Sequence, residues 1–154
     1  MIGVYNLTSA LARSHMKQLL LLVALALPLS SSAQEFPRIS ISIGVHLIQA
    51  EVAATQENRA RGLMFREKLG QNEGMVFRFP APQRVCMWMK NTLIPLSVAF
   101  IGEDGRIINI EDMQPQTTGE HCSQQAARYA LETRQGWFKQ RNIKAGELVS
   151  GLPK

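Results

Sequence analysis

The sequence lacks the features that mark several large protein classes. Its longest apolar run, Leu19 to Leu29, has 11 residues, whereas a membrane-spanning helix needs about 20. Its 17 basic residues are scattered along the chain, and no stretch resembles the Lys/Arg-rich tract of a nucleic-acid-binding protein. We therefore expect no nucleic-acid partner and no stable membrane span once the N-terminal segment described below has been removed.

Common catalytic motifs are also missing. The sequence contains no Gly-x-Ser-x-Gly, His-Glu-x-x-His or phosphate-binding loop. Its acidic residues Glu73, Glu111, Asp112 and Glu132 have no spacing that indicates an acid/base couple. The sequence therefore predicts no cofactor, and it favours a protein that is not an enzyme.

The N-terminal segment has the layout of a secretory signal peptide. A short basic start at Met16–Gln18 precedes the apolar run, and Ser30–Ala33 supplies the small residues that a signal peptidase recognises. We interpret residues 16–33 as a signal peptide cleaved after Ala33, and residues 1–15 as a start codon assigned too early or an extension. Residues 34–154 would then form a single β-rich domain in the periplasm.

Only two cysteines are present, Cys86 and Cys122. Because export leads to an oxidising compartment, the default expectation is a disulfide between them. Such a bridge would stabilise the fold by about 4 kcal/mol through chain entropy. Two other readings stay open, namely a catalytic Cys86 paired with His121 and a metal site with two thiolate ligands.

Alternating apolar residues predict strands through most of the mature region. Residues 38–47 (RISISIGVHL) carry an apolar side chain at every second position, which is the period of a half-buried strand. Gly44 predicts a turn or bulge, after which a second strand begins. Further strands are predicted at residues 74–79 (ended by Pro80 and Pro82), 85–90, 98–101, 106–110, 129–133 and 148–150.

Turn and capping signals complete the predicted fold. Asp104-Gly105 is typical of a hairpin turn. Residues 55–62 predict a short helix that begins after an N-cap at Thr55 and ends at Gly62. Residues 112–125 read as a polar loop, and residues 135–140 as a helical turn. The fold class is mostly β, a compact antiparallel barrel or sandwich with one or two short helices.

Several segments together resemble one known family. They are RARGLMFRE (59–67), GMVF (74–77), MWMKNTLIPL (87–96), FIGEDGRIINI (100–110) and YALETRQGW (129–137). In this order they are similar to the domain-of-unknown-function 192 family, from about Ile39 to Val149. The resemblance implies a compact, mostly β domain, often behind a signal peptide, with no established reaction. Ser97 stands where the family usually has an aspartate, so no role of that acid is transferred.

The most specific segment, VCMWMKNTLIPL, is also the best candidate site. Strand alternation places Val85, Met87 and Met89 on an inner face and Cys86, Trp88 and Lys90 on the other. A tentative ligand site consists of residues that supply an indole, two cations, an amide and a hydroxyl, namely Trp88, Lys90, Asn91, Thr92 and Arg61. The competing interpretation is that Trp88 packs under a loop while Asn91 and Thr92 hydrogen-bond the turn.

Methionine and histidine give a further alternative. Met87 and Met89 point the same way on the predicted strand, and with His46 they would be soft ligands for copper. Methionines at alternate strand positions more often fill a core, so the preferred expectation is no metal. The predicted function is a binding or accessory protein of the cell envelope, whose partner is a small molecule or an envelope protein. The alternatives are a small hydrolase or transferase and, third, a copper-binding protein.

The signal-peptide interpretation predicts a mature N-terminus near Gln34. N-terminal sequencing of the protein recovered from a periplasmic fraction should find it there. Recovery from the cytosol of a chain that still carries Leu19 to Leu29 would contradict the expectation.

Overall fold

The computed structural model describes residues 36–154, so the predicted signal peptide (16–33) and extension (1–15) lie outside the described residues. Eleven helices and strands follow one another in this part of the chain. In order they are β1 (Arg38–Ile43), β2 (His46–Ala53), α2 (Gln56–Arg61), β3 (Glu73–Gln83), β4 (Cys86–Met87), β5 (Leu96–Ile101), β6 (Ile107–Met113), β7 (His121–Cys122), β8 (Ala127–Arg134), α3 (Trp137–Gln140) and β9 (Val149–Ser150).

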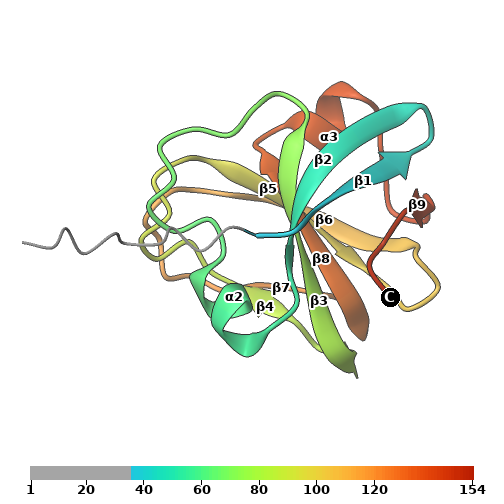
Figure 1. The fold of residues 1–154 in the computed structure, drawn as a ribbon, viewed down its shortest axis with the longest axis horizontal. Helices are drawn as coiled ribbons and strands as arrows, with labels where there is room; N and C mark the ends of the chain where they lie inside the picture. Colours follow the sequence, from blue (N-terminus) through green and yellow to red (C-terminus); the bar gives the residue numbers. More distant parts are fainter. Residues whose placement is uncertain (1–35) are drawn as a thin grey trace, which may run out of the picture. The chain divides into compact units, whose positions relative to one another are not determined.

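Seven strands form one curled sheet in the order β6-β5-β8-β3-β2-β1-β9, and β4 and β7 form a separate two-stranded ribbon (Figure 1). The mostly β class is thus confirmed. The sheet curls into a half-barrel. Its edge strands, β6 and β9, are linked by an isolated antiparallel bridge between the neighbouring residues Arg106 and Leu148. The pairing is antiparallel except between β2 and β3, which run parallel because α2 lies on the connection between them.

The predicted turns occur where the glycines indicated. Gly44 has a φ of 55° between β1 and β2, and Gly105 has a φ of 80° between β5 and β6, both in the left-handed region that glycine adopts without steric cost. The side chain of Thr55 accepts a hydrogen bond from the Asn58 N–H and caps α2, as predicted. These local signals therefore set the connections of the sheet.

Two predicted strand boundaries were wrong. β3 does not end at Pro80 but continues to Gln83, because pairing with β8 stops after Arg78 and resumes at Gln83, and the prolines lie in the unpaired stretch. The strand predicted at 85–90 is reduced to the two residues of β4, because its partner β7 is equally short. The polar loop predicted at 112–125 contains β7.

The core lies on both faces of the central strands. On β8, Leu131 belongs to one buried apolar cluster with Val76 and Ala99. Ala130, one residue earlier, belongs to a second cluster with Phe77 and Phe100 on the opposite face. β8 is paired on both sides, with β3 and with β5. A side chain in the middle of β8 is therefore buried on folding, whichever face of the sheet it occupies.

The predicted disulfide is present. Cys86 and Cys122 are bonded across the β4–β7 ribbon, where they are direct cross-strand partners. Neither cysteine is free, so both the thiolate-metal reading and the catalytic-thiol reading were wrong.

The structure separates the two methionines of the predicted inner face. Met89 is fully buried, whereas Met87 is only partly buried. Met89→Ala should lower the free energy of unfolding by about 2–5 kcal/mol, because it empties a closed site. Met87→Ala should cost roughly half of that or less. Urea unfolding of both variants measures the difference, and equal losses would contradict the burial.

Candidate functional site

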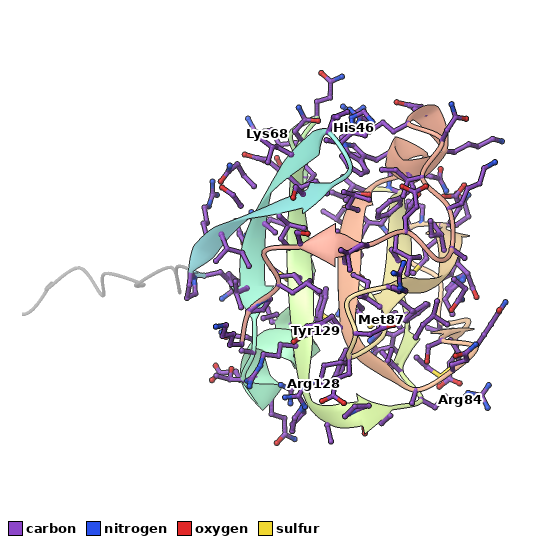
Figure 2. All side chains as sticks on the ribbon, turned by 90° about the vertical axis from the view of Figure 1, so that its right-hand side faces the viewer. His46, Lys68, Arg84, Met87, Arg128 and Tyr129 are labelled. Carbon is purple, nitrogen blue, oxygen red and sulfur yellow. A yellow bond between two sulfur atoms is a disulfide. The ribbon has the colours of Figure 1, made fainter. Side chains whose placement is uncertain are left out.

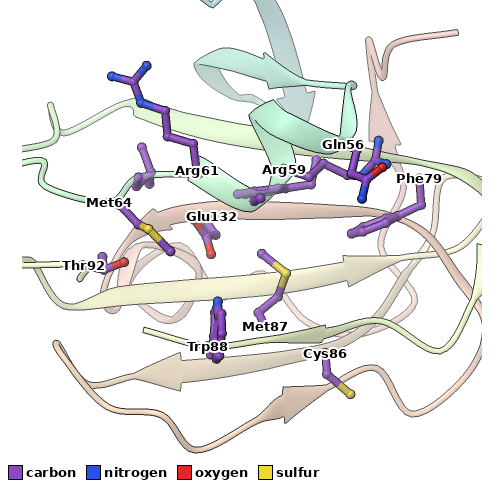
Figure 3. A pocket seen from close by; sticks show the side chains of 14 residues that line it. Gln56, Arg59, Arg61, Met64, Phe79, Cys86, Met87, Trp88, Thr92 and Glu132 are labelled. Atoms are coloured by element: carbon purple, nitrogen blue, oxygen red, sulfur yellow. The ribbon is translucent and has the colours of Figure 1, made fainter. Parts of the chain in front are cut away.

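A cavity of about 260 Å³ lies between α2 and the segment that carries β4 (Figure 3). The first wall is formed by α2 and the residues after it, up to Met64. The second wall is formed by Cys86, Met87 and Trp88, with Thr92 at one end. The lining combines apolar and polar side chains and includes one buried carboxyl group. The lining residues are Gln56, Arg59, Ala60, Arg61, Gly62, Leu63, Met64, Phe77, Phe79, Cys86, Met87, Trp88, Thr92 and Glu132.

That carboxyl group belongs to Glu132 of β8. Its cross-strand neighbours are Met75 on β3 and Val98 on β5, both fully buried. Glu132 itself is 4% exposed, and among residues 36–154 no hydrogen bond or ion pair to its side chain is found. Desolvation disfavours the charged form and raises the pKa of Glu132 to about 8. At neutral pH the group is mainly a neutral carboxylic acid.

Two other polar groups face the same space as Glu132. In Figure 3 the carboxyl of Glu132 points between Met64 and Met87 toward Trp88, whose indole nitrogen lies at the end nearest Glu132. The Thr92 hydroxyl points into the space from the side. Trp88 is 51% exposed, so its ring forms part of the cavity mouth and is not a core residue.

Basic residues surround the mouth, but each is engaged elsewhere. The Nη1 of Arg59 donates to the carbonyls of Ala54 and Arg78. The guanidinium of Arg61 lies 5.9 Å from the centre of the Phe36 ring and points away from the cavity in Figure 3. Lys90 lies over the Trp88 ring at 5.8 Å and does not line the cavity. None of them is close enough to lower the pKa of Glu132, whose shift has desolvation as its sole cause.

The Lys-Asn-Thr step holds the walls together through its backbone. The Asn91 carbonyl accepts from the Phe65 N–H at 2.8 Å, and the Thr92 carbonyl accepts from the Gln116 N–H at 3.1 Å. Thr92 N–H donates to the Met89 carbonyl at 3.0 Å. The backbone of Asn91 and Thr92 therefore joins the segments around Phe65, Met89 and Gln116.

Asn91 has a φ of 60°, a conformation that asparagine tolerates better than most residues. Its exposed side chain does not line the cavity, and its amide reaches only the Met64 sulfur at 4.0 Å. Of the five residues of the sequence-predicted site, the structure thus brings Trp88, Thr92 and Arg61 to the cavity. It places Lys90 and Asn91 beside it.

The structure does not gather the three candidate copper ligands. His46 lies at the start of β2, where its ring contacts Trp137. Met87 lies on β4 in the separate two-stranded ribbon, well apart from His46 in Figure 2. Met89 is fully buried in the second cluster. No metal site is assembled from these side chains.

The residue that sequence reasoning missed is Glu132. Nothing in the spacing of Glu132 pairs it with another acid, so the sequence alone gives it no role. The available signal was its place in the apolar strand YALET (129–133), between Leu131 and Thr133. A charged residue in the middle of a strand that is buried on both faces is rare unless it is paired.

Ser97, which stands where the resembled family usually has aspartate, also makes well-defined contacts. Its hydroxyl accepts from the Gly136 N–H at 2.8 Å and donates to Asp112 on the neighbouring strand. It lies one position from Val98 along β5 and therefore on the face opposite Glu132. Ser97 is thus a structural link between β5, β6 and the start of α3.

Several solved structures are similar to this chain, and two of them are described here. A protein from Sinorhizobium meliloti 1021, described as a "putative transcription regulator", is 31% identical with a TM-score of 0.71, covering 76% of this chain and 95% of its own. A protein of unknown function from Novosphingobium aromaticivorans DSM 12444 is 32% identical with a TM-score of 0.71, covering 79% and 89%. The comparison with curated proteins gives no match.

Fold and cavity together define a small, mostly β protein in which a buried acid, Glu132, faces a cavity beside an exposed tryptophan. Residues 39–151 match the family DUF192, described as an uncharacterized ACR. The chain belongs to this domain-of-unknown-function 192 family, as the sequence motifs indicated. Among residues 36–154, no helix is long and apolar enough to cross a membrane.

The raised pKa of Glu132 predicts that the free energy of unfolding falls as pH rises. The folded state holds a proton that the unfolded state releases above about pH 4.5, so stability falls as pH rises from there and levels off above about 8. Glu132→Gln does not titrate. It should therefore gain roughly 3–5 kcal/mol relative to the native protein between pH 5 and pH 9. Urea unfolding at several pH values measures this, with the exposed Glu120→Gln as control. If the difference in free energy of unfolding between Glu132→Gln and the native protein stayed constant across that pH range, Glu132 would have an ordinary pKa.

Proposed function

We propose that this protein is a binding protein of the cell envelope whose ligand is a small molecule held in the cavity beneath α2. The observation that carries the proposal is the Glu132 carboxyl, which faces the cavity without a partner in residues 36–154. The Glu132 oxygens are not among the fully covered atoms without a hydrogen-bond partner, so they open onto the cavity. A ligand in the cavity can therefore form the hydrogen bond that the protein does not supply.

Trp88 supports the same proposal. A large aromatic side chain that is half exposed contributes little to folding, whereas beside a cavity it offers a flat apolar surface and one N–H donor. The cavity lining also contains the thioethers of Met64 and Met87, which are flexible and adapt to ligands of different shape. Apolar walls with a few converging polar groups are typical of small-molecule sites.

The envelope location is part of the proposal. The signal-peptide layout of residues 16–33 supports export, and the Cys86–Cys122 disulfide is typical of an oxidising compartment. Because the basic residues are scattered along the sequence, we propose a small-molecule partner and no nucleic acid.

A second candidate function is a small enzyme in which Glu132 transfers a proton. A carboxyl with a pKa of about 8 in a cavity is suited to general acid/base chemistry near neutral pH. The two functions differ in the effect of Glu132→Gln on a bound molecule. If the protein only binds, the molecule is recovered unchanged from both the native protein and Glu132→Gln. If it is an enzyme, the native protein converts the molecule and Glu132→Gln leaves it unchanged.

Binding at Trp88 predicts that its indole is open to solvent. In a Trp137→Phe background, which leaves Trp88 as the reporter in the mature protein, acrylamide should quench the fluorescence efficiently. Trp88→Ala should cost under about 1 kcal/mol of stability, whereas Trp137→Ala, at a buried site, should cost about 3–5 kcal/mol. Shielding of Trp88 from acrylamide, or a large stability loss on its removal, would leave the binding proposal without its aromatic surface.

A further inference from the structure

We propose that the cavity ligand is a small organic carboxylate with an apolar body, held by three donors at Trp88, Thr92 and Glu132. The inference rests on the proposed binding function and narrows it to one chemical class. It follows from the direction of the polar groups, the charge around the mouth and the apolar walls.

The polar groups inside the cavity are matched to an acceptor. The indole N–H of Trp88 is a donor only, and the Thr92 hydroxyl supplies a second donor. In Figure 3 both point toward the space in front of Glu132. Glu132 adds a third donor while it is protonated, which burial favours at neutral pH. A ligand carboxylate accepts from all three through its two oxygens.

The charge around the cavity has the matching sign. The charged lining residues are Arg59, Arg61 and Glu132, and Lys90 lies beside them over Trp88. With Glu132 protonated, the charged residues that line the cavity are both arginines, and the exposed Glu120 lies outside it, beside the disulfide. An anion is attracted by this arrangement, and an organic cation is repelled until Glu132 ionises.

Within the described part of the chain, no other ionisable group pairs with Glu132. The neighbouring strands present Met75, Phe77 and Val98 to it. On β8 the ionisable residues of the same face are Arg128 and the exposed Arg134, which lines a different cavity. The remaining groups are committed elsewhere: Arg59 bonds two backbone carbonyls, and His121 of β7 pairs with Glu111.

The walls define the rest of the ligand. The buried Phe77 and the partly buried Phe79 line the cavity, and Met64 and Met87 lie on either side of the Glu132 carboxyl in Figure 3. A volume of about 260 Å³ accommodates a short alkyl or single-ring body. Phenylacetate is therefore a suitable probe, and phenethylamine tests the opposite charge on the same ring.

The test measures binding of both probes to the mature protein, by calorimetry and by Trp88 fluorescence in the Trp137→Phe background. Phenylacetate should bind at pH 6.5 at least tenfold more tightly than phenethylamine. Its affinity should fall about tenfold per pH unit above pH 8, as Glu132 loses its proton. Glu132→Gln keeps a donor, so it should retain binding within a few-fold at pH 6.5 and lose the pH dependence. Arg61→Gln should weaken phenylacetate two- to fivefold at low salt, and Lys139→Gln on α3 should change nothing.

The opposite outcomes are distinct. Preferential binding of phenethylamine that strengthens with rising pH would overturn the carboxylate class and leave a binding site for cations. Failure of both probes to bind, with Trp88 still open to acrylamide, would also overturn this inference but leave the proposed function standing. Shielding of Trp88 in the same sample would instead remove the proposed function itself.

Discussion

The central constraint is that β8 is buried on both faces and paired on both edges, so the Glu132 carboxyl in its middle meets solvent only through the cavity. Leu131 and Thr133 fill one face, and Ala130 and Glu132 fill the other. An acid at this position cannot be solvated by rotating its side chain. The fold therefore either has to neutralise Glu132 or give it a partner, and desolvation keeps it neutral.

The cavity exists because its outer wall is held away from Glu132 by separate links. The Cys86–Cys122 disulfide fixes β4 to β7, and the backbone of Asn91 and Thr92 ties this wall to Phe65 and to Gln116. The motif MWMKNT thus acts mainly through its main chain. Only Met87, Trp88 and Thr92 of the motif present side chains to the cavity, which explains how one segment both specifies the fold and lines a site.

Much of the fold could be predicted from the sequence, because it depends on local signals. Gly44, Thr55 and Gly105 set turns and a helix cap through backbone geometry alone. The prediction of the disulfide needed only two cysteines and an oxidising compartment. Strand ends were less predictable, since β4 is short because β7 is short, and β3 passes Pro80 because the pairing there is interrupted.

The candidate site was only half visible in the sequence. Trp88, Thr92 and Arg61 were found because they lie in or near a distinctive motif. Glu132 was missed because its burial comes from β3 and β5 on either side and from α2 above it. These neighbours are distant in sequence, so the pattern of apolar and polar residues along β8 does not reveal them.

The most direct measurement is a carbon-detected NMR titration of the Glu132 carboxyl between pH 4 and pH 10, with the resonance assigned by its loss in Glu132→Gln. The burial described here predicts a midpoint of about 8, with Glu132 protonated at neutral pH. A midpoint near that of an ordinary glutamate, about 4.3, would contradict it. Glu132 would then be a solvated or paired anion, and the cavity would not be built around a neutral acid.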